Sequence, residues 1–286
     1  QLARQAREKW LRTYRKELEE LIEKLTKNEA TIIISGEPFN IERSFAASLY
    51  MDHLSIAITR VRGSGVTINI SLVGSRSTNI TIPKLFNDGT LRPMQYGWLM
   101  TDGSIHKDGY PQMGTNQAWQ SVMCALMLPR NNHVYIHGVS LNNDSMSIRW
   151  HLMAIDHKNK DESKTEVTEK VLKLNDNEFL TFLLFAVLGD GTVNAKNKSI
   201  VLAIGSSKYK LWKDIVKRAR ALGFRERDVK NLKVIKIQSS KAVELARKWL
   251  SNALIRAMIE DLALLSDAEK LRRLLTLAST KIKPRG

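Results

Sequence analysis

Cysteine is nearly absent from this sequence, with Cys124 as the single one among 286 residues. One thiol cannot form an intrachain disulfide, and a metal site built from several thiolates is excluded. Because disulfides are typical of secreted proteins, we expect an intracellular protein that is not secreted. It would reside in the cytoplasm or nucleoid of a prokaryote, or in the matrix of an organelle.

Long apolar runs are also lacking. No uncharged segment reaches the roughly 20 residues of a membrane-spanning helix, and no signal peptide is visible. We therefore expect no membrane partner. Acidic residues are few, with 29 Asp and Glu against 45 Lys and Arg and a formal net charge of +16. This charge indicates a polyanionic partner or an acidic membrane surface, and the first is favoured here. The 43% of apolar residues is enough for a folded core.

Two apolar stretches end in the same dipeptide. Phe182–Thr192 reads FLLFAVLGDGT, and Tyr96–Ser104 reads YGWLMTDGS. Each run is long enough for two to three helical turns, and Gly is typical just beyond a helix C-terminus. Asp102 and Asp190 are thus predicted at helix C-terminal ends, where the helix dipole disfavours a carboxylate by a few tenths to about 1 kcal/mol. A divalent cation shared by the two carboxylates would offset this cost.

The paired stretches resemble the two motifs of a LAGLIDADG homing endonuclease of the single-chain, two-motif type. The resemblance implies that the two helices form the central interface of the fold. It also implies that Asp102 and Asp190, each just before the Gly that closes its motif, bind the catalytic metal. That metal is expected to be Mg²⁺, with Mn²⁺ as an alternative.

The helix interface of this family uses small residues. Gly97 falls where the first motif has its small helix-contact residue. The corresponding residue of the second motif is Phe185, which departs from the family pattern. We therefore expect Ala186 or Gly189 to allow the close approach of the two helices.

The order of periodic segments predicts a mixed α/β fold of the α+β type. Residues 1–90 are predicted as an N-terminal extension, with an amphipathic helix over 3–28 and a small antiparallel sheet. Residues 91–155 and 175–286 are predicted as two pseudo-symmetric halves, joined by the polar linker 156–174. Each half follows the order helix, hairpin, helix, hairpin, helix. By the resemblance, their antiparallel sheets form a saddle over duplex DNA.

Phosphodiester hydrolysis needs an activated water and a stabilised leaving oxygen, and divalent ions on paired carboxylates provide both. Members of the family usually place amide or basic side chains around the metals. By position, we expect Gln112 to act in this way in the first half and Lys236 or Lys248 in the second. For any one of these lysines, a solvated or phosphate-contacting role is the simpler interpretation.

The hairpins are expected to read DNA, because a two-stranded ribbon fits the major groove and its alternate side chains reach base edges. The predicted contacts are His106, Lys107, Gln112, His133, Tyr135, His137, Arg149, Asn194, Lys196, Asn197 and Lys198. His133 and His137 could also suggest zinc, but no third ligand has a suitable spacing.

The sequence therefore favours a monomeric, intron-encoded homing endonuclease with internal pseudo-two-fold symmetry. It would make a metal-dependent double-strand break at a specific site in a long duplex DNA, with intron RNA as a further partner. Two alternatives stay open. The same scaffold without turnover would serve as an RNA maturase or a DNA-binding regulator. In an unrelated basic nucleic-acid-binding protein, the two Asp-Gly pairs would be ordinary caps, far apart in space.

Overall fold

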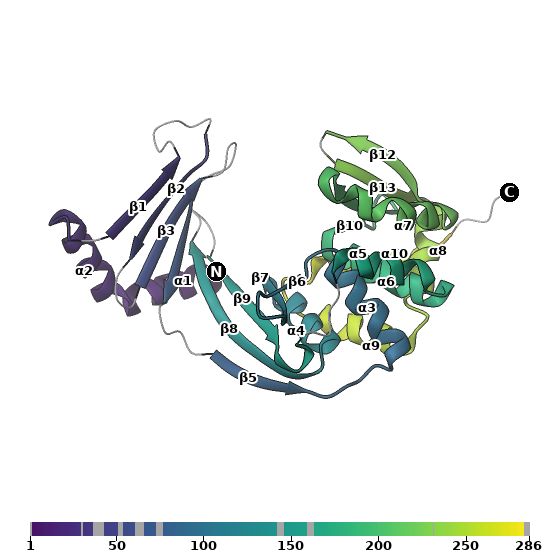
Figure 1. The fold of residues 1–286 in the computed structure, drawn as a ribbon, viewed down its shortest axis with the longest axis horizontal. Helices are drawn as coiled ribbons and strands as arrows, with labels where there is room; N and C mark the ends of the chain where they lie inside the picture. Colours follow the sequence, from purple (N-terminus) through teal and green to yellow (C-terminus); the bar gives the residue numbers. More distant parts are fainter. Residues whose placement is uncertain are drawn as a thin grey trace. The chain divides into compact units, whose positions relative to one another are not determined.

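The computed structural model describes residues 2–29, 31–36, 43–50, 54–60, 66–72, 77–141, 146–158, 163–230 and 232–282 (Figure 1). The chain forms two compact units. The first contains residues 1–78, 114–116 and 134–151, and the second contains residues 79–113, 117–133 and 152–286. Helices combine with antiparallel sheets, which confirms the predicted α+β class.

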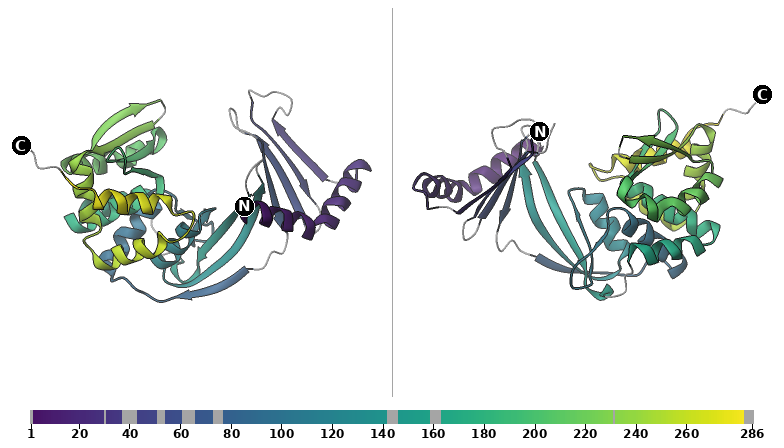
Figure 2. Two further views of the ribbon diagram at one scale, coloured as in Figure 1. Left: turned by 180° about the vertical axis from the view of Figure 1, so that it is seen from behind. Right: turned by 45° about the horizontal axis from the view of Figure 1, so that its top comes forward.

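The first unit contains an antiparallel sheet and two N-terminal helices (Figure 2), the second of which packs on the sheet. Its strands β1 (Thr31–Gly36), β2 (Phe45–Tyr50), β3 (Leu54–Arg60) and β4 (Val66–Leu72) pair in sequence order. β4 then pairs with the C-terminal part of β8 (Arg130–Leu141), at residues 139–141. The single helix predicted over 3–28 is instead two helices, α1 (Leu2–Thr13) and α2 (Arg15–Thr26), separated at Tyr14. Leu21 of α2 packs with Leu49 and Ile56 of the sheet.

The elements of the first motif come next; most of their residues lie in the second unit, but residues 77–78, 114–116 and 134–151 belong to the first. β5 (Ser77–Ile82) leads to α3 (Asp88–Met100), and a hairpin of β6 (Ser104–Ile105) and β7 (Pro111–Thr115) follows. After α4 (Ala118–Met127), the chain continues into β8 and β9 (Met146–Ala154) and a short 3₁₀ turn, Ile155–His157. The predicted order of helix, hairpin, helix, hairpin is therefore present.

The same order recurs after α5 (Lys164–Lys173). α6 (Asp176–Asp190) is followed by β10 (Gly191–Asn194), β11 (Ser199–Gly205), the 3₁₀ turn Ser206–Lys208, α7 (Tyr209–Ala221), β12 (Arg225–Val229) and β13 (Leu232–Gln238). These strands form an antiparallel sheet in the order β10-β11-β13-β12. Three helices complete the chain, namely α8 (Ser240–Trp249), α9 (Ala253–Leu262) and α10 (Glu269–Ser279).

One part of the predicted linker is not irregular. Lys164–Lys173 forms α5, because Ser163 and Glu166 make a capping box that the polar composition of the segment concealed. Among the described helices, none combines the length and the apolar character that crossing a membrane requires.

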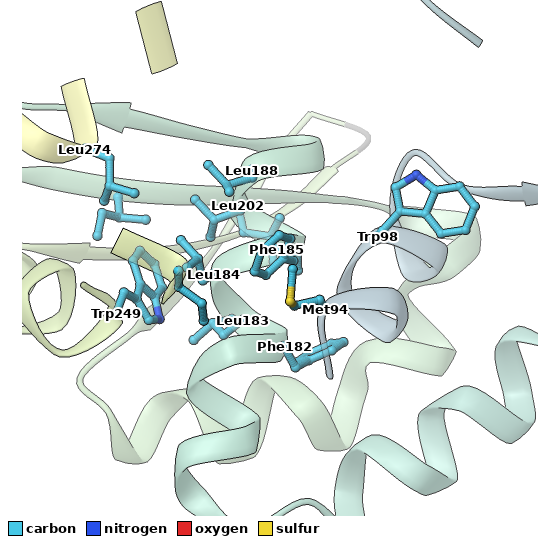
Figure 3. Packing of buried hydrophobic residues seen from close by; sticks show 14 of the residues in the cluster. Met94, Trp98, Phe182, Leu183, Leu184, Phe185, Leu188, Leu202, Trp249 and Leu274 are labelled. Carbon is cyan, nitrogen blue, oxygen red and sulfur yellow. The ribbon is translucent and has the colours of Figure 1, made fainter. Parts of the chain in front are cut away.

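The core of the second unit is built around α6. Asn175 and Glu178 start this helix with the predicted capping box, in which the Glu178 N–H donates to Asn175 Oδ1 at 3.0 Å. Residues 182–188 are all buried, so the helix is apolar around its whole circumference, as expected of a central helix. Figure 3 shows Met94 of α3 together with Phe182 and Phe185 of α6 in this core.

Candidate functional site

The two motif helices pack at backbone distance through Gly97 of α3. A Cβ atom on Gly97 would fall 2.5 Å from the carbonyl oxygen of Phe182, 2.8 Å from Phe185 Cβ and 2.9 Å from the Ala186 nitrogen. No side chain fits such spaces without moving a helix. The glycine on α3 therefore accommodates Phe185, the residue that departs from the family pattern.

The C-terminal ends of these helices meet through a second glycine. A Cβ atom on Gly189 would lie 2.3 Å from Thr101 Oγ1 and 3.4 Å from Asp102 Oδ2. The Thr101 hydroxyl donates to the carbonyl oxygen of Gly97 at 2.9 Å, which fixes its rotamer against α3. The end of α3 is thus held against the end of α6, where Asp190 is the last helical residue.

Asp102 and Asp190 form a pair of neighbouring carboxyl groups. Burial is the main cause that raises the pKa of Asp102, and the charge of Asp190 and a hydrogen bond between the two side chains add to it. Both residues are nevertheless exposed at the surface, so solvent or a ligand can reach them. Two motifs that are 88 residues apart in sequence, at Asp102 and Asp190, are therefore brought together in space.

Lys270 of α10 supplies a positive charge at this pair. Its ammonium donates to the carbonyl oxygens of Leu188 at 2.9 Å and Gly189 at 2.7 Å, two acceptors left open where α6 ends. Its charge opposes the rise in the pKa of Asp102. Burial lowers the pKa of Lys270 itself, and the two carboxylates counteract that shift.

An amide holds the other side of Asp102. The Nε2 of Gln120, on α4, donates to Asp102 Oδ2 at 3.1 Å, and Gln120 is buried. This bond lowers the pKa of Asp102 because it stabilises the ionised form. At the start of α5, burial and then the charge of Lys208 lower the pKa of Lys164. The charges of Asp190 and Asp102 act in the opposite direction and raise it.

The donor set fits a hard divalent cation. Two carboxylates that repel each other are a favourable environment for such an ion, and carboxylate oxygens are the ligands that Mg²⁺ and Mn²⁺ take. In the part of the chain that the structure describes, no three or more His, Cys, Asp or Glu side chains gather as a metal cluster. An ion at Asp102 and Asp190 would therefore complete its coordination with water, backbone or substrate oxygens, as Mg²⁺ commonly does.

Gln112 lies near the pair but in a different element from the amide that contacts Asp102. It is on β7 opposite Ser104, which follows Asp102 by two residues. Its predicted role stays a prediction, while the amide bonded to Asp102 belongs to Gln120. The sequence offered no signal for Gln120, because it lies on the inner face of a helix without a motif.

The two predicted lysines lie on elements other than α10, which carries Lys270, and their catalytic role stays a prediction. Lys248 lines a pocket with Asn177, in the first turn of α6, and at 1.5 Å per residue that turn is about 20 Å from Asp190. Lys236 lies on β13, two strands from Thr192 of β10 and hence about 10 Å away. The lysine at the site is Lys270, on a C-terminal helix with no motif-like pattern.

The predicted DNA-contacting residues occupy hairpin turns and strands. In the second unit, the turn of His106 and Lys107 is closed by a bond from the Asp108 N–H to His106 Nδ1 at 3.2 Å. Asn194 Oδ1 accepts from the Asn197 N–H at 2.8 Å, which orders the turn that contains Lys196 and Lys198. His133 Nδ1 is 2.8 Å from Asn79 Oδ1.

The remaining predicted contacts lie in the first unit. The rings of Tyr135 and His151 stack with centroids 4.7 Å apart, and His137 is 6.0 Å from His151. Arg149 is exposed on β9. His151 was not predicted, although it continues the alternation that contains Arg149. The roles of all these residues in binding stay predictions.

Comparisons with known proteins give only remote structural similarity. No family model and no curated protein matches the sequence. The full-length DUF199/WhiA protein of Thermotoga maritima is similar over 71% of this chain, with 12% identity and a TM-score of 0.37, and this chain spans 64% of its length. The homing endonuclease I-WcaI, bound to its DNA recognition sequence, matches 67% of this chain and 88% of its own, with 17% identity and a TM-score of 0.41. Variants of the homing endonuclease I-DmoI match 58% of this chain and 98% of their own, with 14% identity and a TM-score of 0.37.

Proposed function

We propose that this chain is a divalent-metal-dependent DNA endonuclease that hydrolyses phosphodiester bonds at a specific duplex site. The observation that supports the proposal most strongly is the pair Asp102 and Asp190 at the abutting ends of two helices. A cap-and-turn role for each Asp-Gly does not explain why they are paired, since two neighbouring carboxylates destabilise each other.

Asp102 and Asp190 would hold the ion, Mg²⁺ or Mn²⁺. When bound, such an ion lowers the pKa of a water and offsets the charge that develops on the phosphate and the leaving oxygen. One carboxylate comes from each motif helix, so the site would be shared between the two halves. That arrangement supports a cut in each strand of a duplex, and hence a double-strand break.

The neighbouring side chains would set the geometry of this site. Gln120 donates to Asp102 Oδ2 and is buried, so it orients the carboxylate. The Lys270 ammonium is held by hydrogen bonds to two carbonyl oxygens, and its charge interacts with both carboxylates. It would hold negative charge of the phosphate near the site and would limit repulsion while substrate is absent.

The substrate class follows from charge and site together. A formal charge of +16 favours a polyanion, and the paired acids are suited to phosphate chemistry. We take duplex DNA as the substrate and a monomer as the acting form, with intron RNA as a further candidate partner.

A second candidate function is nucleic-acid binding without cleavage, as in a maturase or regulator. One observation favours it: the Lys270 ammonium already supplies positive charge to the carboxylate pair. In that case the pair would be a structural junction between helix ends and would need no metal.

The experiment that separates these functions is cleavage of a randomised duplex library with Mg²⁺ or Ca²⁺. The nuclease is expected to cut both strands with Mg²⁺ and to lose this activity in Asp102→Asn and Asp190→Asn. Asp214→Asn, an exposed residue of α7, is the matched control and should cut normally. Binding without cleavage under every metal would reject the nuclease and support the second function.

A further inference from the structure

A small basic pocket lies where β12 and β13 meet the start of α8. Four cationic side chains line it, and no acidic residue appears in the lining that the structure describes; the lining residues are Gly223, Arg225, Arg227, Lys236, Gln238, Ser239, Ser240 and Lys241. Its volume is about 190 Å³. Sites for drug-sized ligands usually have roughly 300–1,000 Å³, so the occupant is a small anion or one group of a larger molecule.

The alternation of β12 explains why this pocket contains only positive charge. Arg225 and Arg227 point to one face of the strand, and Glu226 and Asp228 point to the other. The two acids are engaged on that other face. Glu226 pairs with Arg220 and accepts from the Tyr209 hydroxyl at 2.5 Å, and Asp228 pairs with Lys233. They therefore cannot neutralise the pocket.

The pocket places like charges directly against each other. Arg225 and Lys236 are register partners on β12 and β13, a relation that brings their Cβ atoms to about 4.5–5.5 Å. Like charges at opposed positions destabilise a sheet. Within the described part of the chain, none of the pocket's four cations takes part in an ion pair. A bound anion would remove this repulsion.

The start of α8 adds further positive character. Ser239 is the N-cap residue, but its side chain makes no capping bond, and the first turn has no acid. Without a capping side chain or an acid, the start of this helix keeps its partial positive charge. Lys241 lies over Gly223, since a Cβ there would be 2.8 Å from Lys241 Cδ and 3.6 Å from Nζ. The missing side chain at residue 223 thus leaves room for this ammonium at the pocket.

We infer that this pocket binds one backbone phosphate of duplex DNA and anchors the substrate away from the carboxylate pair. The inference rests on the proposed function, which provides DNA as the source of the phosphate. Lys236 is two strands from Thr192, and Arg225 is one strand farther, so the pocket is about 10–15 Å from β10, which follows Asp190 directly. A phosphate contact here fixes the position of the duplex without reading its sequence.

The test is the salt dependence of duplex binding, measured by fluorescence anisotropy with a labelled random-sequence duplex in EDTA. The plot of log binding constant against log salt has a slope of about −0.9 per neutralised phosphate. The double variant Arg225→Gln and Lys236→Gln should weaken binding and make the slope shallower by about 0.9. Lys241→Gln, at an exposed position on α8, should weaken binding in the same direction.

The matched control is Lys210→Gln with Lys213→Gln. Both lysines are exposed on α7, which packs against the other side of the sheet, and the control removes the same charge. Loss of the opposed charges should leave the pocket variant's melting temperature unchanged or higher, so weaker binding would not reflect misfolding. An unchanged slope in the pocket variant, or an equal change in the control, overturns the anchor and leaves the nuclease proposal standing. A wild-type protein that binds no duplex overturns both.

Discussion

At the scale of single residues, the site is a balance of charges around Asp102. Burial and Asp190 disfavour the ionised carboxylate, whereas Lys270 and Gln120 favour it. Burial and the charge of Asp190 outweigh Lys270 and Gln120, since the pKa of Asp102 is raised. In the folded protein without a metal, ionised Asp102 therefore lowers stability.

Asp102→Asn should accordingly raise the melting temperature of the metal-free protein by a few degrees at neutral pH, with solvent screening limiting the gain. Because the folded-state pKa of Asp102 is raised, the wild type loses stability as pH rises from the ordinary aspartate range through that raised pKa. The gain should thus be small below pH 4 and should grow as the pH rises through the raised pKa of Asp102. Differential scanning calorimetry in EDTA across this range measures it.

Asp88→Asn, in the first turn of α3, is the control for that effect. Lys84 bonds to Asp88 at 2.8 Å and lowers its pKa, with a smaller contribution from Arg92. Its loss should lower the melting temperature slightly at neutral pH, the opposite sign. A melting temperature that falls in both variants would contradict the charge balance at the site.

Lys270→Met should destabilise the metal-free protein by about 1–3 kcal/mol, because two carbonyl oxygens and two carboxylates lose a charged partner. Mg²⁺ should then raise the melting temperature of this variant more than that of the wild type. Lys213→Met, at an exposed position, should change stability by less than about 0.5 kcal/mol. Chemical denaturation with and without Mg²⁺ provides the comparison, and equal losses in the two variants would argue against a special role of Lys270.

At the scale of elements, the site depends on the contact between α3 and α6. This contact leaves no room for a side chain at residue 97, because Gly97 is surrounded by backbone atoms of α6 and by the Phe185 Cβ. The carboxylates of Asp102 and Asp190 become neighbours only when the ends of α3 and α6 are in contact at Thr101 and Gly189. The site therefore requires both helices.

Gly97→Ala should therefore cost about 1–3 kcal/mol or more in unfolding free energy and reduce cleavage, since the helices must separate to admit the methyl group. Gly89→Ala is the matched control in the first turn of α3. A Cβ there would meet only the side-chain oxygens of Asn87 at 3.6 Å and Glu178 at 3.9 Å, so a gain of about 0.4–1 kcal/mol is expected. Urea denaturation of the two variants gives the values, and similar stabilities would refute the helix contact.

The same elements show what a sequence can and cannot predict. The motif helices, the hairpins after them and the capping box at Asn175 were predictable, because local periodicity and capping chemistry determine them. Asp102 and Asp190 were predictable because Asp190 ends α6 and Asp102 lies two residues beyond the end of α3. Gln120 and Lys270 were not, because their proximity to the carboxylates arises from tertiary packing alone.

At the scale of the whole molecule, binding and cleavage are expected to be separable. The positive charge is spread over the chain, whereas the carboxylates occupy one point of the second unit. The saddle predicted from the two halves stays a prediction. Replacing both acids adds two units to the formal charge of +16, which favours a polyanion further.

The double variant Asp102→Asn and Asp190→Asn should therefore bind random duplex at least as tightly as the wild type in EDTA, while it cuts nothing. Its affinity should fall steeply with salt, as expected for phosphate contacts. Electrophoretic mobility shifts at several salt concentrations test this. Weaker binding by the variant would mean that the two acids support the DNA-binding surface itself.

The central claim is that Asp102 and Asp190 form one shared metal site. The most direct test is a titration with Mn²⁺ in the presence of duplex DNA, in which the free ion is followed by electron paramagnetic resonance. We predict that the wild type and Asp214→Asn remove free Mn²⁺ beyond the amount bound by DNA alone. Asp102→Asn and Asp190→Asn should each lose this binding. Equal Mn²⁺ binding by all four proteins would contradict the account and leave the pair as a structural junction between two helices.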